Sequence, residues 1–65
     1  MFSLYFFEIN GGRFRTAIEA AVTAAIIARR MGYSRPELYS LGNDNYEVAF
    51  YNEEGYSIRA YIEFN

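Results

Sequence analysis

The aromatic side chains of this 65-residue chain avoid one segment entirely. Thirteen residues are Tyr or Phe, and none of them lies between Thr16 and Met31, a segment built largely from alanine. Aromatic rings favour the pleated surface of β-strands, whereas small alanine side chains allow a helix to lie close to a sheet. The partition predicts one helix packed on a β-sheet, which is an α+β fold.

The length of the chain limits it to one small domain, residues 1–65. A domain of this size buries only about 60% of the surface that its unfolded chain exposes, so its stability margin is thin. Cys and His are both absent, which excludes disulfides and the usual zinc sites and removes the commonest catalytic base. No motif supports an activated nucleophile. We therefore expect a hydrophobic core, no cofactor, no metal and no enzymatic activity.

The charge of the chain argues weakly against nucleic acid as a partner. Eight acidic and six basic residues give a formal net charge of −2, whereas phosphate backbones call for a clustered positive surface. All six basic residues are arginine. Lysine, the commonest protector of exposed strand edges, is missing, so an open edge is expected to be adhesive.

No segment is expected to enter a membrane. The longest apolar stretch, Ala17 to Ala28, is interrupted by Glu19 and Thr23 and is shorter than the roughly 20 residues that span a bilayer. Met1 to Ile9 has neither the positive start nor the small-residue cleavage site of a signal peptide. We expect a soluble, cytoplasmic protein.

The helix has clear start and stop signals. Thr16-Ala17-Ile18-Glu19 matches a capping box, in which the Thr hydroxyl accepts from the amide of Glu19 and the carboxylate reaches back to the amide of Thr16. Arg29 and Arg30 suit the negative end of the helix dipole, Gly32 suits a left-handed C-terminal residue, and Pro36 prevents continuation.

The helical periodicity predicts one broad apolar face and one polar face. The apolar face comprises Ala17, Ala21, Ala25 and Ala28, flanked by Ile18, Val22 and Ala24. Glu19, Thr23 and Arg30 centre the polar face. Ile26 and Ile27 flank the polar stripe, so one or both should be partly exposed. Either the helix is sunk into a wide sheet, or these two residues form an interface on the helix side, such as a homodimer contact.

The strand signals predict a four-stranded, mostly antiparallel sheet in the order β-α-β-β-β. The predicted strands are Phe2 to Ile9, Glu37 to Leu41, Tyr46 to Tyr51 and Tyr56 to Phe64. Asn10-Gly11-Gly12 is expected to form a turn, with a possible short extra strand at Arg13 to Arg15. Loops are expected at residues 42–45 and 52–55.

Alternation along the last two strands assigns each side chain to a face. The face under the helix should carry Tyr46, Val48, Phe50, Tyr56, Ile58, Ala60, Ile62 and Phe64. The opposite face should carry Glu47, Ala49, Tyr51, Ser57, Arg59, Tyr61 and Glu63.

The face that points away from the helix contains the best candidate binding residues. Tyr51, Arg59 and Tyr61 would form an aromatic patch around an arginine, joined by Tyr5 or Tyr39, and Tyr and Arg dominate hot spots of protein interfaces. The alternative is stacking of single-stranded bases on the rings, although Glu47 and Glu63 on the same face would repel phosphates.

Arg13 and Arg15 form a secondary candidate site. As alternate residues of an extended segment near the helix N-terminus, they would bind an anion or an acidic partner, or they are solvated arginines at a sheet edge. The nearby Gly11-Gly12 pair lacks a third glycine and a Gly-Lys-Ser/Thr run, so no nucleotide site is predicted.

The layout of the chain resembles a family of small inhibitors carried by phages and mobile elements, the anti-CRISPR proteins. The resemblance rests on a short strand, a glycine turn, a capped alanine-rich helix ending in Met31-Gly32, Pro36, and strands through Leu41-Gly42 and Val48-Ala49-Phe50. It implies a cofactor-free domain that evades host defence inside the host cell. Such a domain binds a CRISPR surveillance complex or nuclease and blocks it sterically. A charge of −2 suits occlusion through the tyrosines better than mimicry of DNA.

Overall fold

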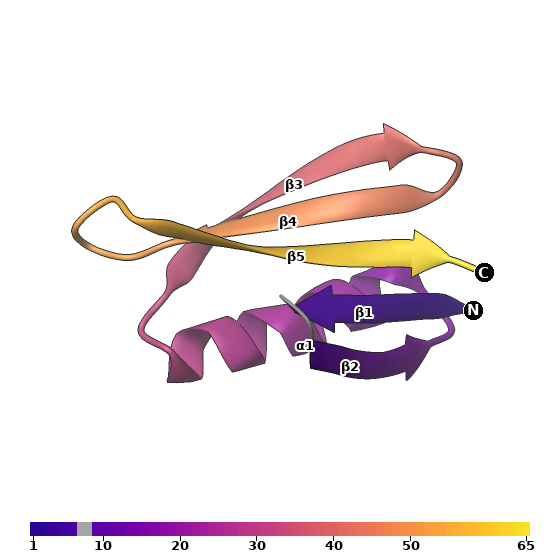
Figure 1. Cartoon of the computed structure of the whole chain (residues 1–65), viewed down its shortest axis with the longest axis horizontal. Helices are drawn as coiled ribbons and strands as arrows, with labels where there is room; N and C mark the ends of the chain where they lie inside the picture. Colours follow the sequence, from indigo (N-terminus) through magenta and orange to yellow (C-terminus); the bar gives the residue numbers. More distant parts are fainter. Residues whose placement is uncertain (7–8) are drawn as a thin grey trace.

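The computed structural model describes residues 1–6 and 9–65, with residue 9 as backbone only, and contains one helix and one sheet (Figure 1). The elements follow the order β1 (Phe2–Phe6), β2 (Ile9–Phe14), α1 (Ala17–Arg30), β3 (Ser34–Gly42), β4 (Asn45–Tyr51) and β5 (Ser57–Phe64). All neighbouring strands are antiparallel, in the sheet order β2-β1-β5-β4-β3. The predicted α+β class is confirmed. The sheet has five strands rather than four, because the possible extra strand at Arg13 to Arg15 is present as part of the longer strand β2. Phe7 and Glu8, placed in the first strand by the sequence, lie outside the described residues.

The predicted turn at Asn10-Gly11-Gly12 is instead part of strand β2. Leu4 pairs with Gly12 while Tyr5 pairs with Asn10, so Gly11 is the extra residue of a β-bulge. A Cβ atom on Gly11 would lie 2.8 Å from the side chain of the buried Leu4. Glycine is needed here for close approach to β1 rather than for a reversal of the chain.

The predicted ends of the helix are confirmed. Thr16 is the N-cap, and its Oγ1 accepts from the amide of Glu19 at 3.1 Å. The Glu19 carboxylate differs from the prediction, since it accepts from the Thr16 hydroxyl. At the other end, the amides of Gly32 and Tyr33 donate to the carbonyls of Arg29 and Ala28, which is a Schellman motif.

The buried face of α1 is rotated from the predicted one. Ala20, Ala24 and Ala28 are fully buried at i, i+4 and i+8, whereas Ile18 and Val22, predicted to flank the apolar face, are exposed. Alanines have no side chain beyond Cβ, so they allow the helix backbone to approach the sheet more closely than branched residues would. The helix therefore turns its smallest side chains, not its most hydrophobic ones, toward the core.

Strand β3 is longer than predicted and includes Pro36. Arg35 has a φ of 52°, and the register with β4 shifts between Ser34 and Glu37, so the proline occupies a bulge of an edge strand, where it is tolerated. The strand ends in a two-residue turn to β4. Its central residues, Asn43 and Asp44, both have positive φ, as a type I′ hairpin requires.

The core lies between α1 and the central strands. It comprises Leu4, Phe6, Ala20, Ala24, Ala28, Val48, Phe50, Ile58, Ala60 and Ile62. Tyr46 packs against it in part. Tyr56 was predicted to belong to the core, and this prediction is wrong. The residue precedes β5 in the hairpin loop and is 66% exposed. Phe64 is half-exposed at the sheet margin, where its ring centroid lies 5.1 Å from that of Phe2.

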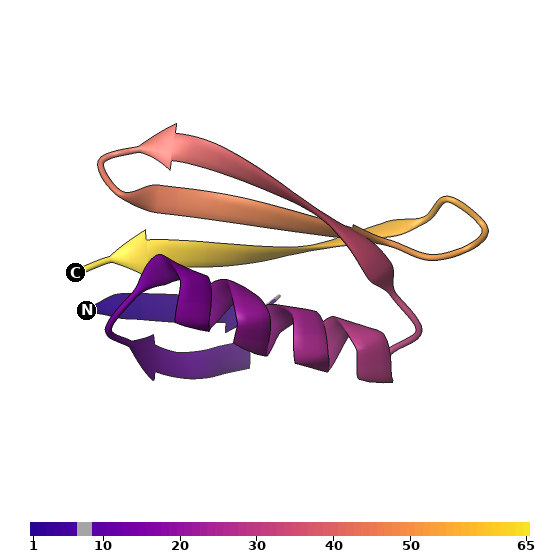
Figure 2. The same cartoon turned by 180° about the vertical axis from the view of Figure 1, so that it is seen from behind.

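Helix α1 covers only part of the sheet. From the helix side, α1 crosses in front of β1, and β3 diverges from it toward the β3–β4 hairpin (Figure 2). The strand residues buried in the core come from β1, β5 and β4. Within residues 1–6 and 9–65, no helix has the length and apolar character needed to cross a membrane.

Candidate binding face of the sheet

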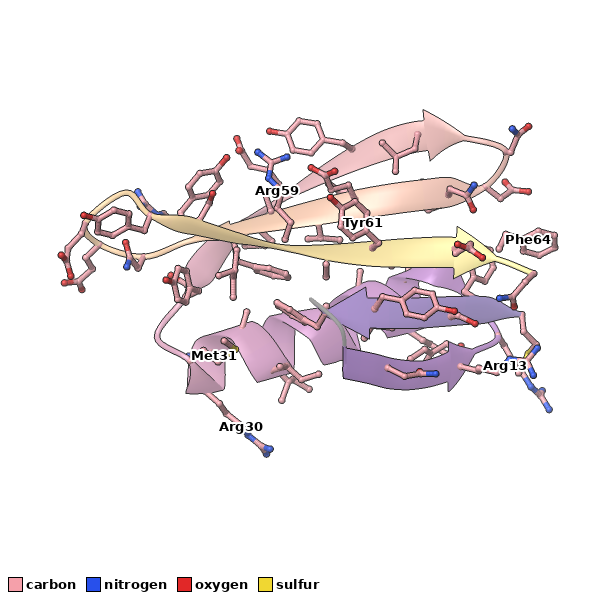
Figure 3. The ribbon with its side chains drawn as sticks, viewed as in Figure 1. Arg13, Arg30, Met31, Arg59, Tyr61 and Phe64 are labelled. Carbon is pink, nitrogen blue, oxygen red and sulfur yellow. The ribbon has the colours of Figure 1, made fainter. Side chains whose placement is uncertain are left out.

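The sheet face opposite α1, here called the outer face, has no described element packed over it (Figure 3). The strand registers place one row of side chains across it. Tyr39 on β3 pairs with Glu47 on β4, Glu47 pairs with Tyr61 on β5, and Tyr61 pairs with Tyr5 on β1. Facing residues of neighbouring strands lie on one face with their Cβ atoms about 5 Å apart. Tyr5, Tyr39 and Tyr61 therefore form a tyrosine row around Glu47.

A second row lies beside the tyrosine row. Glu37 pairs with Ala49, and Ala49 pairs with Arg59. Ala49 belongs to the outer face, as the alternation predicted, yet it is fully buried. Because no helix covers it, the larger side chains around it must shield it from water. Ala49 is thus shielded, while Glu37, Arg59 and Tyr61 around it remain exposed.

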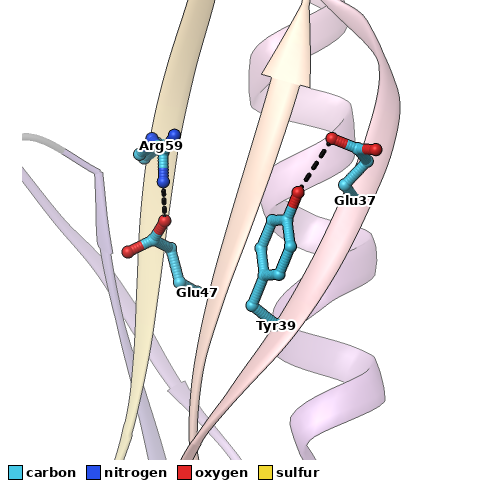
Figure 4. A network of polar contacts seen from close by, with 4 residues as sticks. All are labelled: Glu37, Tyr39, Glu47 and Arg59. Atoms are coloured by element: carbon cyan, nitrogen blue, oxygen red, sulfur yellow. Dashed lines mark hydrogen bonds and ion pairs between the residues drawn. The ribbon is translucent and has the colours of Figure 1, made fainter.

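Polar contacts hold side chains of both rows in place (Figure 4). Arg59 forms an ion pair with Glu47, and the Tyr39 hydroxyl donates a hydrogen bond to Oε1 of Glu37 at 3.0 Å. Both contacts join the second row to the tyrosine row: the ion pair links β5 to β4, and the hydrogen bond links two residues of β3. They restrict the rotamers of an arginine and a tyrosine before any partner arrives.

The same contacts change the acidity of the groups involved. A hydrogen bond from Tyr51 and a second from Tyr39 hold the pKa of the Glu37 carboxyl below its usual range. The carboxylate in turn raises the pKa of both tyrosine hydroxyls. Glu47 raises the pKa of Arg59. At neutral pH Glu37 is therefore an anion and both hydroxyls are donors.

The structure brings the primary candidates of the sequence onto one face. Tyr51, Arg59 and Tyr61 lie on the outer face, and Tyr39 joins them through β3. Arg59 and Tyr61 are exposed, whereas Tyr51 is partly covered. Glu37 also belongs to this group, although it was not predicted to. Its position two residues before Tyr39 on a strand was the available signal, since such residues share a face.

The secondary candidates lie apart from this group. Arg13 is at the far end of β2, beside the chain termini in Figure 3, and Arg15 follows the end of that strand. Both are exposed, and neither forms an ion pair or a side-chain hydrogen bond with a described residue. Ile26 is half-exposed, as predicted for at least one of the two isoleucines, whereas Ile27 packs against the core.

No ligand cluster for a metal ion is present in the part of the chain that the structure describes: its acidic side chains form no group of three or more. A single carboxylate held by two tyrosines has no adjacent second acid or nucleophile among the contacts described above. The outer face thus carries tyrosine rings, the carboxylates of Glu37, Glu47 and Glu63, and the paired cation Arg59.

Comparison with protein-family models found no matching family, and comparisons with curated proteins and with solved structures found no significant match.

Proposed function

We propose that this chain is a non-enzymatic protein-binding module that engages its partner through the outer face. The observation that carries the proposal is the tyrosine row, three rings aligned across four strands around Glu47, which is paired with Arg59 of the neighbouring row. Tyr and Arg are enriched in interface hot spots. The surrounding carboxylates supply hydrogen-bond acceptors at the rim of such a patch.

The polar contacts of the outer face favour binding because they order the side chains in advance. A partner that meets freely rotating side chains pays about 0.5–1.5 kcal/mol for each one that it immobilises. Tyrosine has only two side-chain torsions, so its ordering costs little. Tyr39 is tied to Glu37, and Arg59 to Glu47, which lowers that cost further.

The charge of the outer face favours protein over single-stranded nucleic acid as the partner. Three acids, Glu37, Glu47 and Glu63, share this face with Arg59, and Arg59 is already paired. Phosphate groups would meet a net negative surface. A protein surface with apolar area flanked by Lys or Arg complements it better.

A narrower version of the proposal names the partner class. The resemblance to anti-CRISPR proteins suggests a CRISPR surveillance complex or nuclease, which the chain would inhibit by steric occlusion inside the host cell. The basic surfaces with which such effectors hold nucleic acid have the charge that the outer face would complement.

Affinity capture from a bacterial lysate tests the broader proposal. Tagged wild-type chain is compared with Tyr39→Ala/Tyr61→Ala and with the matched control Tyr56→Ala, which removes an exposed tyrosine from the β4–β5 loop. Loss of two hot-spot rings should weaken binding of the captured partner by about 30-fold or more. The control should retain it. Equal recovery by all three proteins would exclude the outer face as the binding surface.

Cleavage assays with purified CRISPR effectors test the narrower version. The wild-type chain should reduce target cleavage by at least one effector, and the double variant should not. If the tyrosine-dependent partner proves unrelated to CRISPR systems and no effector is inhibited, the inhibitor assignment fails while the protein-binding module stands.

A further inference from the structure

An apolar groove of about 390 Å³ runs between α1 and strand β3, on the opposite side of the sheet from the outer face. Its walls include Ile18 and Val22 of the helix and Leu38 of β3, and Val48 lines its sheet side. Ile18, Val22 and Leu38 remain 76%, 54% and 59% exposed, respectively. Apolar side chains exposed to this degree around one concave site mark a binding surface.

The groove follows from the way α1 is seated. The helix places Ala20, Ala24 and Ala28 on the core. The neighbouring Ile18 and Val22 therefore line the hollow beside β3. Strand β3 diverges from the helix (Figure 2), and all nine of its residues are exposed. The inner face of β3 is thus the part of the sheet that α1 leaves uncovered.

The rim of the groove is a free strand edge. Strand β3 is at the end of the sheet order and pairs only with β4 among the described strands, so its other side presents backbone N–H and C=O groups without strand partners. The devices that discourage edge pairing, Pro36 and the bulge between Ser34 and Glu37, are confined to its first part. Pairing with β4 is regular from Glu37 to Ser40, and the chain has no lysine to protect this stretch.

One end of the groove is cationic. A second hollow, of about 350 Å³, shares Ala25 and Pro36 with the groove and is lined by Arg29 and Arg35. Arg35 uses Nη2 to donate to the carbonyl of Asn52 at 2.8 Å, which leaves most of its five donors available. Arg29 is exposed and forms no ion pair with a described residue.

We propose that the groove and the edge of β3 bind an extended peptide segment of a partner protein, which adds to the sheet as a sixth strand. Main-chain hydrogen bonds to β3 would supply affinity, and alternate side chains would enter the groove. An acidic side chain or a C-terminal carboxylate of the peptide would meet Arg29 and Arg35, where paired charge-assisted hydrogen bonds form.

The geometry of β3 orders the peptide residues. Antiparallel pairing, the slightly more stable arrangement, directs the peptide's C-terminal end toward Ser34. Leu38 and Ser40 share the face of Val48 and Tyr46, so the peptide residues opposite Ser40 and Leu38 should be apolar. The next residue on that face, opposite Pro36, should be acidic. The preferred pattern is apolar, any, apolar, any, acidic.

Two other occupants fit less well. A second copy of the chain would offer no carboxylate from its own β3 to the arginines, because Glu37, the only acid of that strand, lies on the outer face with Ala49. A fatty acid would match the apolar walls and the arginines but would leave the backbone groups of β3 unpaired. A peptide strand satisfies all three features together.

Fluorescence anisotropy with a labelled peptide of this pattern tests the proposal, with the acid-to-Gln peptide and the reversed sequence as probes of charge and direction. Val22→Lys and Arg29→Glu should each weaken binding by about tenfold. The matched controls Ile26→Lys and Arg30→Glu change exposed residues of the same helix that do not line the groove, and they should bind like the wild type.

Hydrogen exchange followed by NMR gives a second readout. Peptide binding should slow exchange of the edge amides of β3 between Leu38 and Leu41. No saturable binding at millimolar peptide, equal binding by the acid-to-Gln peptide, or unchanged exchange in β3 would overturn the proposal. So would dimerisation of the wild-type chain that Val22→Lys abolishes, or displacement of the peptide by decanoate with no protection of β3.

Discussion

Strands β5 and β3 belong to the same sheet and alternate in the same way, but they are covered very differently. In β5, Ile58, Ala60 and Ile62 are buried under α1, and their neighbours are exposed. In β3, Leu38 lies on the same face as Val48, yet it is exposed like every other residue of the strand. Alternation therefore fixes where a side chain points, and the position of the helix decides whether anything covers it.

The difference originates in the helix and not in the strands. Alanines at positions 20, 24 and 28 place α1 close to the sheet, and the strand residues buried with them belong to β1, β5 and β4. A helix of about 10 Å diameter is narrower than five strands spaced about 4.8 Å apart. Five strands cannot all lie beneath one such helix. The uncovered β3 side and the uncovered outer face are direct consequences.

The comparison is tested most strongly by truncating an inner-face residue in each strand. Ile62→Ala removes a fully buried side chain of β5 and should lower the free energy of unfolding by about 2–5 kcal/mol. Leu38→Ala in β3 should change it by about 0.5 kcal/mol or less, since its side chain is already exposed. Urea titration followed by circular dichroism measures both. Equal losses would mean that β3 contributes to the core as β5 does.

The close packing of α1 on the sheet is tested next by Ala24→Leu. The added atoms have no space between α1 and the sheet, so we expect a loss of about 1–3 kcal/mol of stability. Val22→Leu is the matched change on the exposed stripe and should be neutral within about 0.5 kcal/mol. Thermal unfolding of both variants separates them. If Ala24→Leu is tolerated as well as Val22→Leu, close approach does not set the position of α1.

The edge strand β2 should be sensitive to a single added methyl group. Gly11→Ala on β2 forces a Cβ atom against the buried Leu4, which costs about 1–3 kcal/mol of strain, offset by about 0.5–1 kcal/mol from the reduced freedom of the unfolded chain. A net loss of about 1 kcal/mol is expected in urea titration. The same change in a Leu4→Val background should cost less. An undiminished cost there would place the strain elsewhere.

Some of the features behind these tests could be predicted from the sequence, and others could not. The ends of α1 were predictable because capping is local. Thr16 and Glu19 interact within the first turn of the helix, and Gly32 interacts with the last turn. The outer-face grouping of Tyr51, Arg59 and Tyr61 followed from alternation, which is also local. The strand order was not predictable, and neither was the alignment of Tyr39 with Tyr61 through Glu47, because both depend on long-range pairing.

The errors have one physical origin. Asn10-Gly11-Gly12 has turn residues, but the need to accommodate Leu4 on the neighbouring strand determines its conformation. The predicted buried face of the helix was flanked by Ile18 and Val22 because they are hydrophobic. In the structure, alanines occupy the buried face because they allow the helix to pack closer to the sheet. In both cases a contact distant in sequence overrides a local preference. The groove between α1 and β3 results from this rotation of the helix, and no local sequence pattern predicts it.

The smallest expected effect concerns the outer face of β3, where the Tyr39 hydroxyl donates a hydrogen bond to Glu37. The Tyr51 and Tyr39 hydroxyls hold the pKa of Glu37 below the ordinary carboxyl value of about 4.3. A depressed folded-state pKa adds stability above the unfolded pKa, and this increment is lost as pH falls through the folded pKa. Tyr51→Phe, and to a lesser degree Tyr39→Phe, should raise the pKa of Glu37 and narrow the stability difference between neutral and acidic pH. NMR titration of the Glu37 carboxyl carbon measures the shift directly. Tyr61→Phe, whose hydroxyl is not among the groups that shift Glu37, is the control; a comparable shift there would mean that a general change of the face, and not the two hydroxyls, sets the acidity of Glu37.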